Sequence, residues 1–290
     1  FLIGALGSQS HTHLLKDIGF NTQSRETGIN KWIAKSQDGG VKQLKDFFDI
    51  SKAYGISTSM LLSSHYKPVP LPGKYAAADS RHTGASMFPW DVLAPNVDEM
   101  FDLWYDRMMP YYKNEPTLVS LGTANEPGYT VSPESKTFEA QFRVWSKEQY
   151  QEINVANKRW GSSFESFESI TSQEYFKFRD QSQAANYDWL RFVDQQVSGF
   201  FERRKDHLLK ELPGMSVWVK LMGHHGHIGY SHLNEVNNIL HGQNVVGTDG
   251  HDPIWMDLIK SVAPSRPIIN SEWHFLGGQI DMNDQQLIQG

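Results

Sequence analysis

Cysteine is absent from this chain of 290 residues, and its absence removes several chemistries at once. Without a thiol there is no disulfide framework, no cysteine nucleophile and no thiolate metal site. No apolar run approaches the roughly 20 residues needed to cross a bilayer, so we expect no membrane partner. An excess of positive charge is also lacking, because 27 basic residues are scattered among 33 acidic ones and the net charge is −6. This balance argues against nucleic acid as a partner.

Phe1–Leu6 already has the composition of a buried strand, and no basic stretch with a short apolar core of the secretory type is present. We expect truncation at both ends, and a targeting peptide of a secreted or periplasmic protein could have been lost with the beginning. No linker interrupts the sequence, so residues 1–290 are expected to form one domain.

Short apolar runs alternate with longer segments in which apolar residues recur at helical spacing. The seven predicted strands are Phe1–Leu6, Phe20–Ser24, Ile56–Leu62, Thr117–Thr123, Met215–Met222, Asn244–Thr248 and Pro267–Asn270. The predicted helical stripes are Val97–Tyr111, Phe138–Trp145 and Leu190–Leu208, the last of them ended by Pro213 and Gly214. This alternation predicts an α/β fold of the (β/α)8 TIM barrel type, with the eighth strand missing or beyond Gly290. A doubly wound open sheet is the alternative, but Gly4–Ser8 lacks the spacing of its phosphate loop.

Two glutamates follow apolar strands of this predicted barrel. Glu126 lies in Asn125-Glu126-Pro127 after strand four, and Glu272 follows strand seven. These strands face each other across a barrel mouth, so side chains at their ends can converge. Retaining glycoside hydrolysis needs two carboxyl groups about 5–5.5 Å apart, one attacking the anomeric carbon and one protonating the leaving oxygen. We predict Glu126 as the acid/base and Glu272 as the nucleophile, although each alone could also be a loop cap or a salt-bridge partner.

Other polar residues follow the predicted strands, where barrel active sites are built. Arg25 could keep Glu272 ionised or could simply pair with Glu26, and Asn125 is expected to donate to the sugar hydroxyl beside the anomeric carbon. The remaining predicted substrate-binding residues are His65, His224, His225, Asp249, His251 and Trp273. Three histidines within Gly223–His227 could suggest a metal, but no acid lies near them in sequence. We favour sugar binding there and predict no metal and no cofactor.

Aromatic residues make up 12% of the chain and include nine Trp. This content is typical of sugar-stacking surfaces, but also of α/β barrels that fill gaps between helices and sheet, and we assign about two-thirds of the Trp to the core. The longest insertions, Ser63–Asn96 and Gly128–Gln183, leave from the carboxyl ends of strands three and four. We interpret both as long loops that form walls of a substrate cleft.

Several motifs follow strand four. They are Asn125-Glu126, Phe142-Arg143-Val144-Trp145, Asn157-Lys158-Arg159-Trp160-Gly161 and Arg191-Phe192. Residues 117–222 thereby resemble glycoside hydrolase family 42, the β-galactosidases, within the clan of retaining (β/α)8-barrel glycosidases. The resemblance implies that Asn125 and Glu126 form the acid/base pair and that Glu272 is the nucleophile. The chain departs from the family in having Pro127 where Tyr is usual, and in lacking the cysteines that hold a structural zinc in some members.

The favoured function is a retaining, β-galactosidase-like glycoside hydrolase whose partner is a carbohydrate. An endo-acting polysaccharide hydrolase of agarase or mannanase type is one alternative, in which the 63–96 loop would line a groove. A non-catalytic carbohydrate-binding barrel is another, although such a protein has no need for two opposed carboxylates. A serine hydrolase is disfavoured, because Ser8–His11 lacks the G-x-S-x-G elbow.

Overall fold

A computed structural model describes residues 4–6, 11–29, 38–62, 73, 75, 90–125, 136–221, 242–249 and 253–272. Its strands are β1 Gly4–Leu6, β2 Thr22–Thr27, β3 Ser57–Leu62, β4 Leu118–Asn125, β5 Ser216–Leu221, β6 Val246–Asp249 and β7 Ile268–Glu272. All seven predicted strands are confirmed, with ends that differ by at most three residues.

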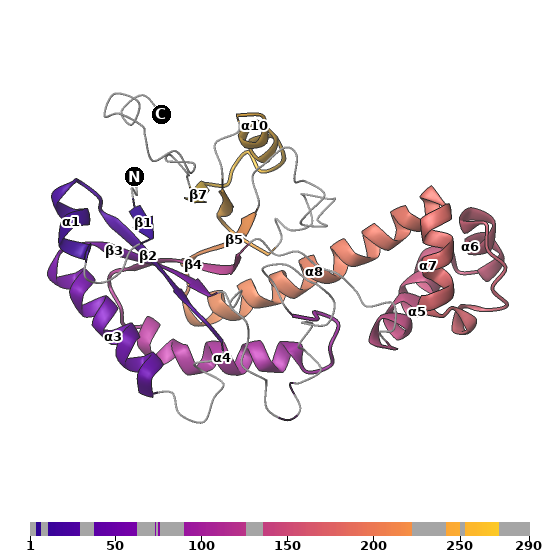
Figure 1. Cartoon of the computed structure of the whole chain (residues 1–290), viewed down its shortest axis with the longest axis horizontal. Helices are drawn as coiled ribbons and strands as arrows, with labels where there is room; N and C mark the ends of the chain where they lie inside the picture. Colours follow the sequence, from indigo (N-terminus) through magenta and orange to yellow (C-terminus); the bar gives the residue numbers. More distant parts are fainter. Residues whose placement is uncertain are drawn as a thin grey trace, which may run out of the picture.

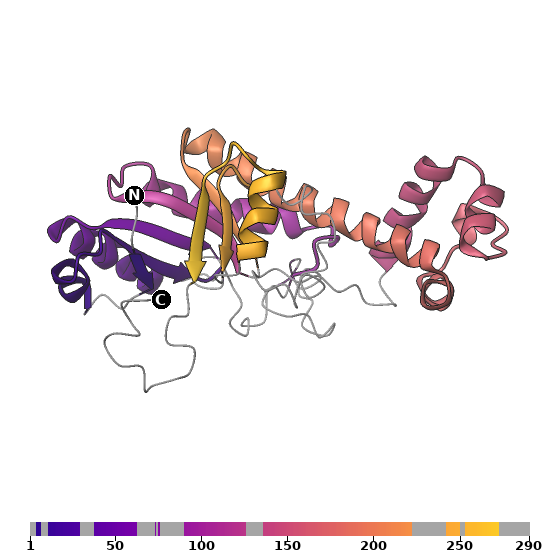
Figure 2. The ribbon, with the colours of Figure 1, turned by 90° about the horizontal axis from the view of Figure 1, so that it is seen from above.

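The strands form one parallel sheet in the sequential order β1-β2-β3-β4-β5-β6-β7 (Figures 1 and 2). A doubly wound sheet would instead reverse its strand order near the middle. Sequential parallel strands with intervening helices are the pattern of a (β/α)8 barrel. The described residues therefore form a partial (β/α)8 barrel, as the sequence predicts.

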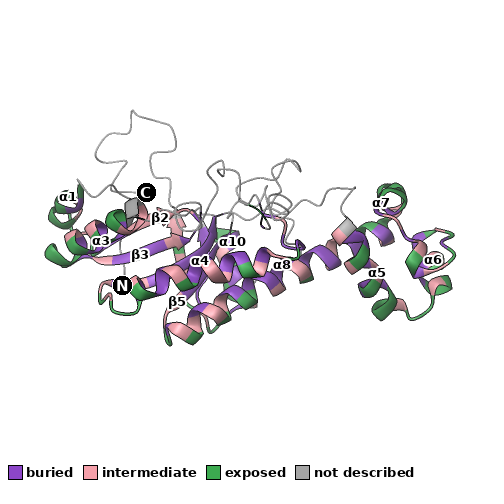
Figure 3. Ribbon diagram, turned by 90° about the horizontal axis from the view of Figure 1, so that it is seen from below, coloured by how far each residue is buried: buried purple, intermediate pink, exposed green. Residues whose placement is uncertain are grey.

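Helices connect the strands and cover one face of the sheet. They are α1 Thr12–Asp17, α3 Asp38–Ala53, α4 Val97–Tyr112, α5 Lys136–Tyr150, α6 Ile153–Trp160, α7 Ser172–Gln181, α8 Gln183–Glu211 and α10 Pro253–Val262, with the 3-10 helix η4 Phe167–Ser169. Figure 3 shows buried stripes along α4 and α8 and exposed residues on α1. Helix α8 ends before Pro213, as predicted, and Gly214 continues the chain at φ 83°. No helix among the described residues is both long enough and apolar enough to span a membrane.

Side chains alternate between the two faces of the sheet. The paired residues Met60 and Leu121 belong to the hydrophobic core that the helices cover. The next positions, Leu61, Gly122 and Trp218, also pair in a row and lie on the opposite face, which we call the interior face. Any side chain at Gly122 would crowd this row, because a Cβ there would lie 2.7 Å from Leu61 Cδ1 and 2.8 Å from Trp218 Cη2.

The described part of the segment between β4 and α8 consists of helices. Helix α5 was predicted from the stripe Phe138–Trp145, whereas the segment as a whole was interpreted as a long loop. Helices α5, α6 and α7 pack with η4 around the first half of α8, at the end of α8 that lies away from the sheet (Figures 1 and 2). We call residues 136–181 the helical insertion. Its position away from the sheet does not support the expectation that this part of the segment walls the cleft.

Aromatic rings pack the helical insertion against α8, as part of the same hydrophobic core that lies between the sheet and its helices. Phe142 and Tyr175 pack with ring centroids 4.3 Å apart, and Phe138 and Trp189 with centroids 4.9 Å apart. Such edge and tilted contacts stabilise beyond the buried area alone. The Phe-Arg-x-Trp motif of α5 thus contributes Phe142 to packing.

Seven of the nine Trp lie in the part of the chain that the structure describes, and each is buried. These are Trp90, Trp104, Trp145, Trp160, Trp189, Trp218 and Trp255. The core interpretation therefore holds for six of these seven, whereas Trp218 is buried on the interior face. None of the seven forms an exposed stacking platform. Trp273, a predicted sugar platform, lies outside the described residues.

Candidate active site

The two strands that precede the predicted acids share an irregularity at their carboxyl ends. In β4, Gly122 pairs with Trp218 while Asn125 pairs with Lys220, so β4 has one residue more than β5 over this stretch. In β7, the pairing positions advance from 270 to 272 while β6 advances by one residue only. Each strand thus contains a β-bulge immediately before the predicted acid. Bulges are frequent beside active sites, because they redirect a side chain at the end of a strand.

Both bulges are fixed by a hydroxyl group that bonds across to the neighbouring strand. Within the β4 bulge, the Thr123 hydroxyl donates to the backbone oxygen of Trp218 at 3.3 Å. Within the β7 bulge, the Ser271 hydroxyl donates to the backbone oxygen of Thr248 at 2.9 Å. Thr248 is itself held from the helix side, since Trp255 Nε1 donates to its hydroxyl at 2.6 Å. These bonds fix the backbone at both strand ends.

Asn125 is the last residue of β4 and is only 6% exposed. Glu126 follows it directly and lies outside the described residues. In the last two strands of the sheet, backbone pairing joins Asp249 at the end of β6 to Glu272 at the end of β7. Because all seven strands run parallel, the ends of β4, β6 and β7 lie at the same edge of the sheet. This edge is the carboxyl edge, where barrel active sites are found.

Arg25 does not lie where the sequence analysis placed it, and we correct that prediction. Its Nη1 donates to the backbone oxygen of Gln43 at 3.1 Å, and its guanidinium lies 5.5 Å from the ring centroid of Phe47. Both partners are in α3, so Arg25 faces the helix layer, as does Gln23 two residues earlier through its bond to Ser51. Burial there lowers the pKa of Arg25, and nearby Asp46 opposes this shift. Strand alternation also puts Glu26 on the other face of β2, which removes the predicted Arg25–Glu26 pair.

Lys220 is a residue that the sequence analysis missed. It is a charged residue within the otherwise apolar run Val217–Leu221, and its side chain is only 3% exposed. Alternation along β5 places it on the interior face with Trp218, beside Asn125 of β4. A lone Lys near the end of an apolar strand was the available signal, because buried Lys is rare unless it is paired.

Several predicted site residues lie outside the described part of the chain. They are Glu126, His65, His224, His225, His251 and Trp273. For Asp249 and Glu272 the structure describes the backbone. Within the described ranges, no cluster of three or more His, Asp or Glu side chains could hold a metal ion.

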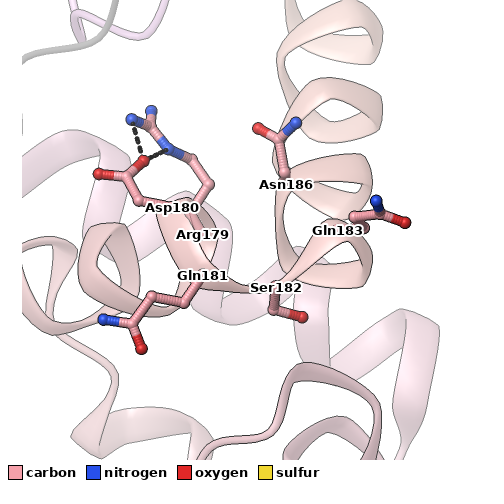
Figure 4. A pocket seen from close by; sticks show the side chains of 6 residues that line it. All are labelled: Arg179, Asp180, Gln181, Ser182, Gln183 and Asn186. Atoms are coloured by element: carbon pink, nitrogen blue, oxygen red, sulfur yellow. Dashed lines mark hydrogen bonds and ion pairs between the residues drawn. The ribbon is translucent and has the colours of Figure 1, made fainter.

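A pocket of about 350 Å³ lies elsewhere, at the corner between α7 and α8 (Figure 4). Its lining residues are Arg179, Asp180, Gln181, Ser182, Gln183 and Asn186. Arg179 is engaged with its neighbour Asp180 at 2.8 Å. This pocket belongs to the region of the helical insertion and contains none of the predicted site residues.

The sequence and the fold of this chain are similar to those of known glycoside hydrolases. A family model described as beta-galactosidase, that of glycoside hydrolase family 42, matches residues 45–266. The curated β-galactosidase LacZ of Heyndrickxia coagulans is 26% identical over 125 residues, which are 39% of this chain and 18% of that protein. The chain therefore spans less than a fifth of that relative.

Two solved structures have the same fold. A β-galactosidase from Bacillus circulans sp. alkalophilus has a TM-score of 0.71 at 17% identity, covering 91% of this chain and 42% of its own. An exo-carrageenase of family 42 from Bacteroides ovatus has a TM-score of 0.70 at 16% identity, covering 93% of this chain and 41% of its own. The family match includes β4, β5 and β6 and extends over well more than half of the chain. The chain belongs to glycoside hydrolase family 42.

Proposed function

We propose that this chain carries the catalytic barrel of a retaining β-glycosidase of the β-galactosidase type. Glu272 is the proposed nucleophile and Glu126 the proposed acid/base. The observation that carries the proposal is the pair of hydroxyl-fixed bulges, one directly before each of these two residues at the same edge of the sheet. Family membership supports it, since the family model is described as that of β-galactosidases.

The proposed reaction runs in two displacements. Glu272 attacks the anomeric carbon while Glu126 protonates the departing glycosidic oxygen, which leaves a covalent glycosyl-enzyme. Glu126 then removes a proton from water, and that water releases the sugar with its original anomeric configuration. In this proposal Asn125, which is buried at the end of β4, donates to the hydroxyl beside the anomeric carbon.

A panel of aryl β-glycosides with galactose, glucose, mannose and fucose heads tests the activity. We expect turnover with the galactoside, loss of turnover in Glu272→Gln, and a slow Glu126→Ala variant that azide accelerates. Glu148→Gln, which changes an exposed residue of α5, is the matched control and should retain the wild-type rate. Wild-type rates in both active-site variants would refute the assignment.

A second candidate is hydrolysis of a polymeric galactan rather than a small galactoside. The similarity of fold to an exo-carrageenase favours this candidate. Reducing-end release from agarose and carrageenans, compared with release from lactose, distinguishes the two. Product sizes on a gel-filtration column would further separate endo from exo cleavage.

A further inference from the structure

The corner between α7 and α8 holds a pocket to which the proposed reaction assigns no role (Figure 4). Its volume of about 350 Å³ lies within the range of about 300–1,000 Å³ that is usual for small-ligand sites. Phe200, 18 residues after the lining residue Ser182, packs on Phe101 of α4 with ring centroids 5.0 Å apart. At about 1.5 Å per residue, the pocket is about 27 Å along α8 from that contact. A ligand in this pocket is therefore held outside the candidate active site.

Hydrogen bonds between the two helices fix the backbone around this pocket. The Ser182 N–H donates to the backbone oxygen of Phe178 at the end of α7, at 2.8 Å. The Ser182 hydroxyl caps α8 by accepting from the Ala185 N–H at 3.3 Å. From the buried side, the Tyr175 hydroxyl of α7 donates to the backbone oxygen of Ala185 at 2.6 Å. The corner is therefore held in place without a ligand, which lowers the entropic cost of binding one.

The guanidinium of Arg179 is held on the α7 side of the pocket. It lies 4.3 Å from the ring centroid of Phe176 and 5.7 Å from that of Trp189, and both rings are buried. Its Nε and Nη2 donate to Oδ1 of Asp180 at 3.0 and 2.8 Å. Among the described residues, nothing accepts a hydrogen bond from Arg179 Nη1 or donates one to Asp180 Oδ2. The pair therefore keeps one donor group and one acceptor for a ligand.

The lining residues determine which class of ligand fits. All six are polar, and besides the Arg179–Asp180 pair they are Gln181, Ser182, Gln183 and Asn186. No apolar side chain lines the pocket, which disfavours an apolar ligand, and the two paired charges cancel, which disfavours an anion such as phosphate. Within the described ranges no group of acids and histidines could hold a metal ion either. The three amides each combine donors with an acceptor, as sugar hydroxyls do, so a neutral polyhydroxyl compound matches this lining.

An exposed aromatic ring lies next to these amides. Tyr187 is 50% exposed and directly follows Asn186 in α8. It is also four residues after Gln183, and residues at this spacing lie on the same side of a helix. Arg191, one turn further along, lies 5.8 Å from the centroid of the Tyr187 ring. A half-exposed ring with a polar end suits the apolar face of a sugar that remains partly in water.

We propose that this pocket is a second carbohydrate-binding site, which holds a neutral oligosaccharide outside the candidate active site. The amides of Gln183 and Asn186 exchange hydrogen bonds with the hydroxyls of one sugar unit. The Arg179–Asp180 pair binds further hydroxyls, and Tyr187 stacks on the neighbouring sugar unit. Membership of a glycoside hydrolase family supports a sugar over other polyhydroxyl compounds. The inference goes beyond the proposed function and does not depend on the role of either proposed catalytic acid.

The test is isothermal titration calorimetry with a sulfur-linked galactotriose, whose thioglycosidic bonds resist hydrolysis. It measures the affinity and the number of binding sites in the wild type and in three variants. The double variant Gln183→Ala/Asn186→Ala should lose one binding site, or bind there about tenfold more weakly, because it removes hydrogen bonds to the sugar. Tyr187→Ala should weaken binding at the same site about threefold or more. Gln173→Ala, which changes an exposed glutamine of α7 outside the pocket, is the matched control and should bind as the wild type does.

Both residues changed in the double variant are exposed, and alanine favours the helix, so this variant should fold, which circular dichroism verifies. A folded double variant with the affinity and the number of sites of the wild type overturns the inference, as does a wild type that binds inorganic sulfate but no saccharide. If the wild type hydrolyses no aryl glycoside, yet the double variant loses a saccharide site, only the proposed function is refuted. An active wild type whose saccharide binding is unchanged in the double variant refutes this inference alone.

Discussion

Replacing Gly247 by alanine tests how closely β5 and β6 approach each other beneath the candidate site. The added methyl group would lie 2.4 Å from the backbone oxygen of Val219 and 2.6 Å from Trp218 Cε3. The first contact is with the backbone of a central strand, which cannot rotate away as a side-chain end can. Overpacking of this kind costs about 1–3 kcal/mol, and we expect the upper end, about 3 kcal/mol. With a urea dependence of about 3 kcal/mol per molar, the unfolding midpoint should fall by about 1 M.

Two other glycines provide matched controls for this substitution. Gly199 lies within α8, where an added Cβ would meet only Arg203 Nη1 at 3.3 Å, so Gly199→Ala should stabilise by about 0.5–1 kcal/mol. Gly122→Ala meets the side chains of Leu61 and Trp218 and should destabilise less than Gly247→Ala. Urea unfolding followed by Trp fluorescence and far-UV circular dichroism measures all three. If the free energy of unfolding of Gly247→Ala is within about 0.5 kcal/mol of the wild-type value, the two strands do not approach as closely as described.

Three further predictions concern other parts of the molecule. Asp188→Ala should lower stability by about 2–5 kcal/mol in urea unfolding, because it leaves the buried Trp160 Nε1 and the half-buried Tyr150 OH without their acceptor. Burial, and then the hydrogen bond to Asp188, raise the pKa of Tyr150 above its ordinary value. The native state therefore resists ionising this phenol, whereas the unfolded state ionises it near pH 10. The free energy of unfolding should therefore fall as the pH rises past 10, and it should fall less steeply in Tyr150→Phe. Because Arg25 lies against α3, Arg25→Ala should change kcat/KM by less than about twofold and should lower stability by about 0.5–1 kcal/mol. A large loss of rate would contradict this placement.

The fold was predictable because its signals are local and repeated. Except for β2, whose residues Thr22–Thr27 are all polar, each strand contains apolar residues, and each long helix carries an apolar stripe. Errors at single positions therefore do not change the order of elements. Helix α8 is an example, since the stripe from Leu190 to Leu208 and the Pro213-Gly214 pair set its extent and its end. The helical insertion was predicted less well, because its aromatic contacts join residues far apart in sequence, such as Phe142 and Tyr175.

The candidate site was predictable only in part, because it depends on which face of a strand each residue occupies. Arg25 lies on a strand that contains no apolar residue, so no alternation in the sequence revealed that it faces α3. Lys220 was overlooked because β5 is strongly hydrophobic, so its single Lys was treated as one more residue of the strand and not as a site candidate. The pairing of β4 with β5 places Lys220 beside Asn125, and the contacts of Arg25 with Gln43 and Phe47 place it against α3.

The bulges illustrate a limit that no single-strand pattern can overcome. A bulge is a relation between two strands, and its sequence signal here is only a hydroxyl residue, Thr123 or Ser271, shortly before a carboxylate. Without the extra residue, the face that each strand end presents would be reversed, because side chains alternate with a period of two. The chemistry proposed for Glu126 and Glu272 therefore depends on two backbone irregularities as much as on the acids themselves. Removing the bond that fixes a bulge, for instance by Ser271→Ala, should consequently reduce kcat far more than it reduces the stability of the fold.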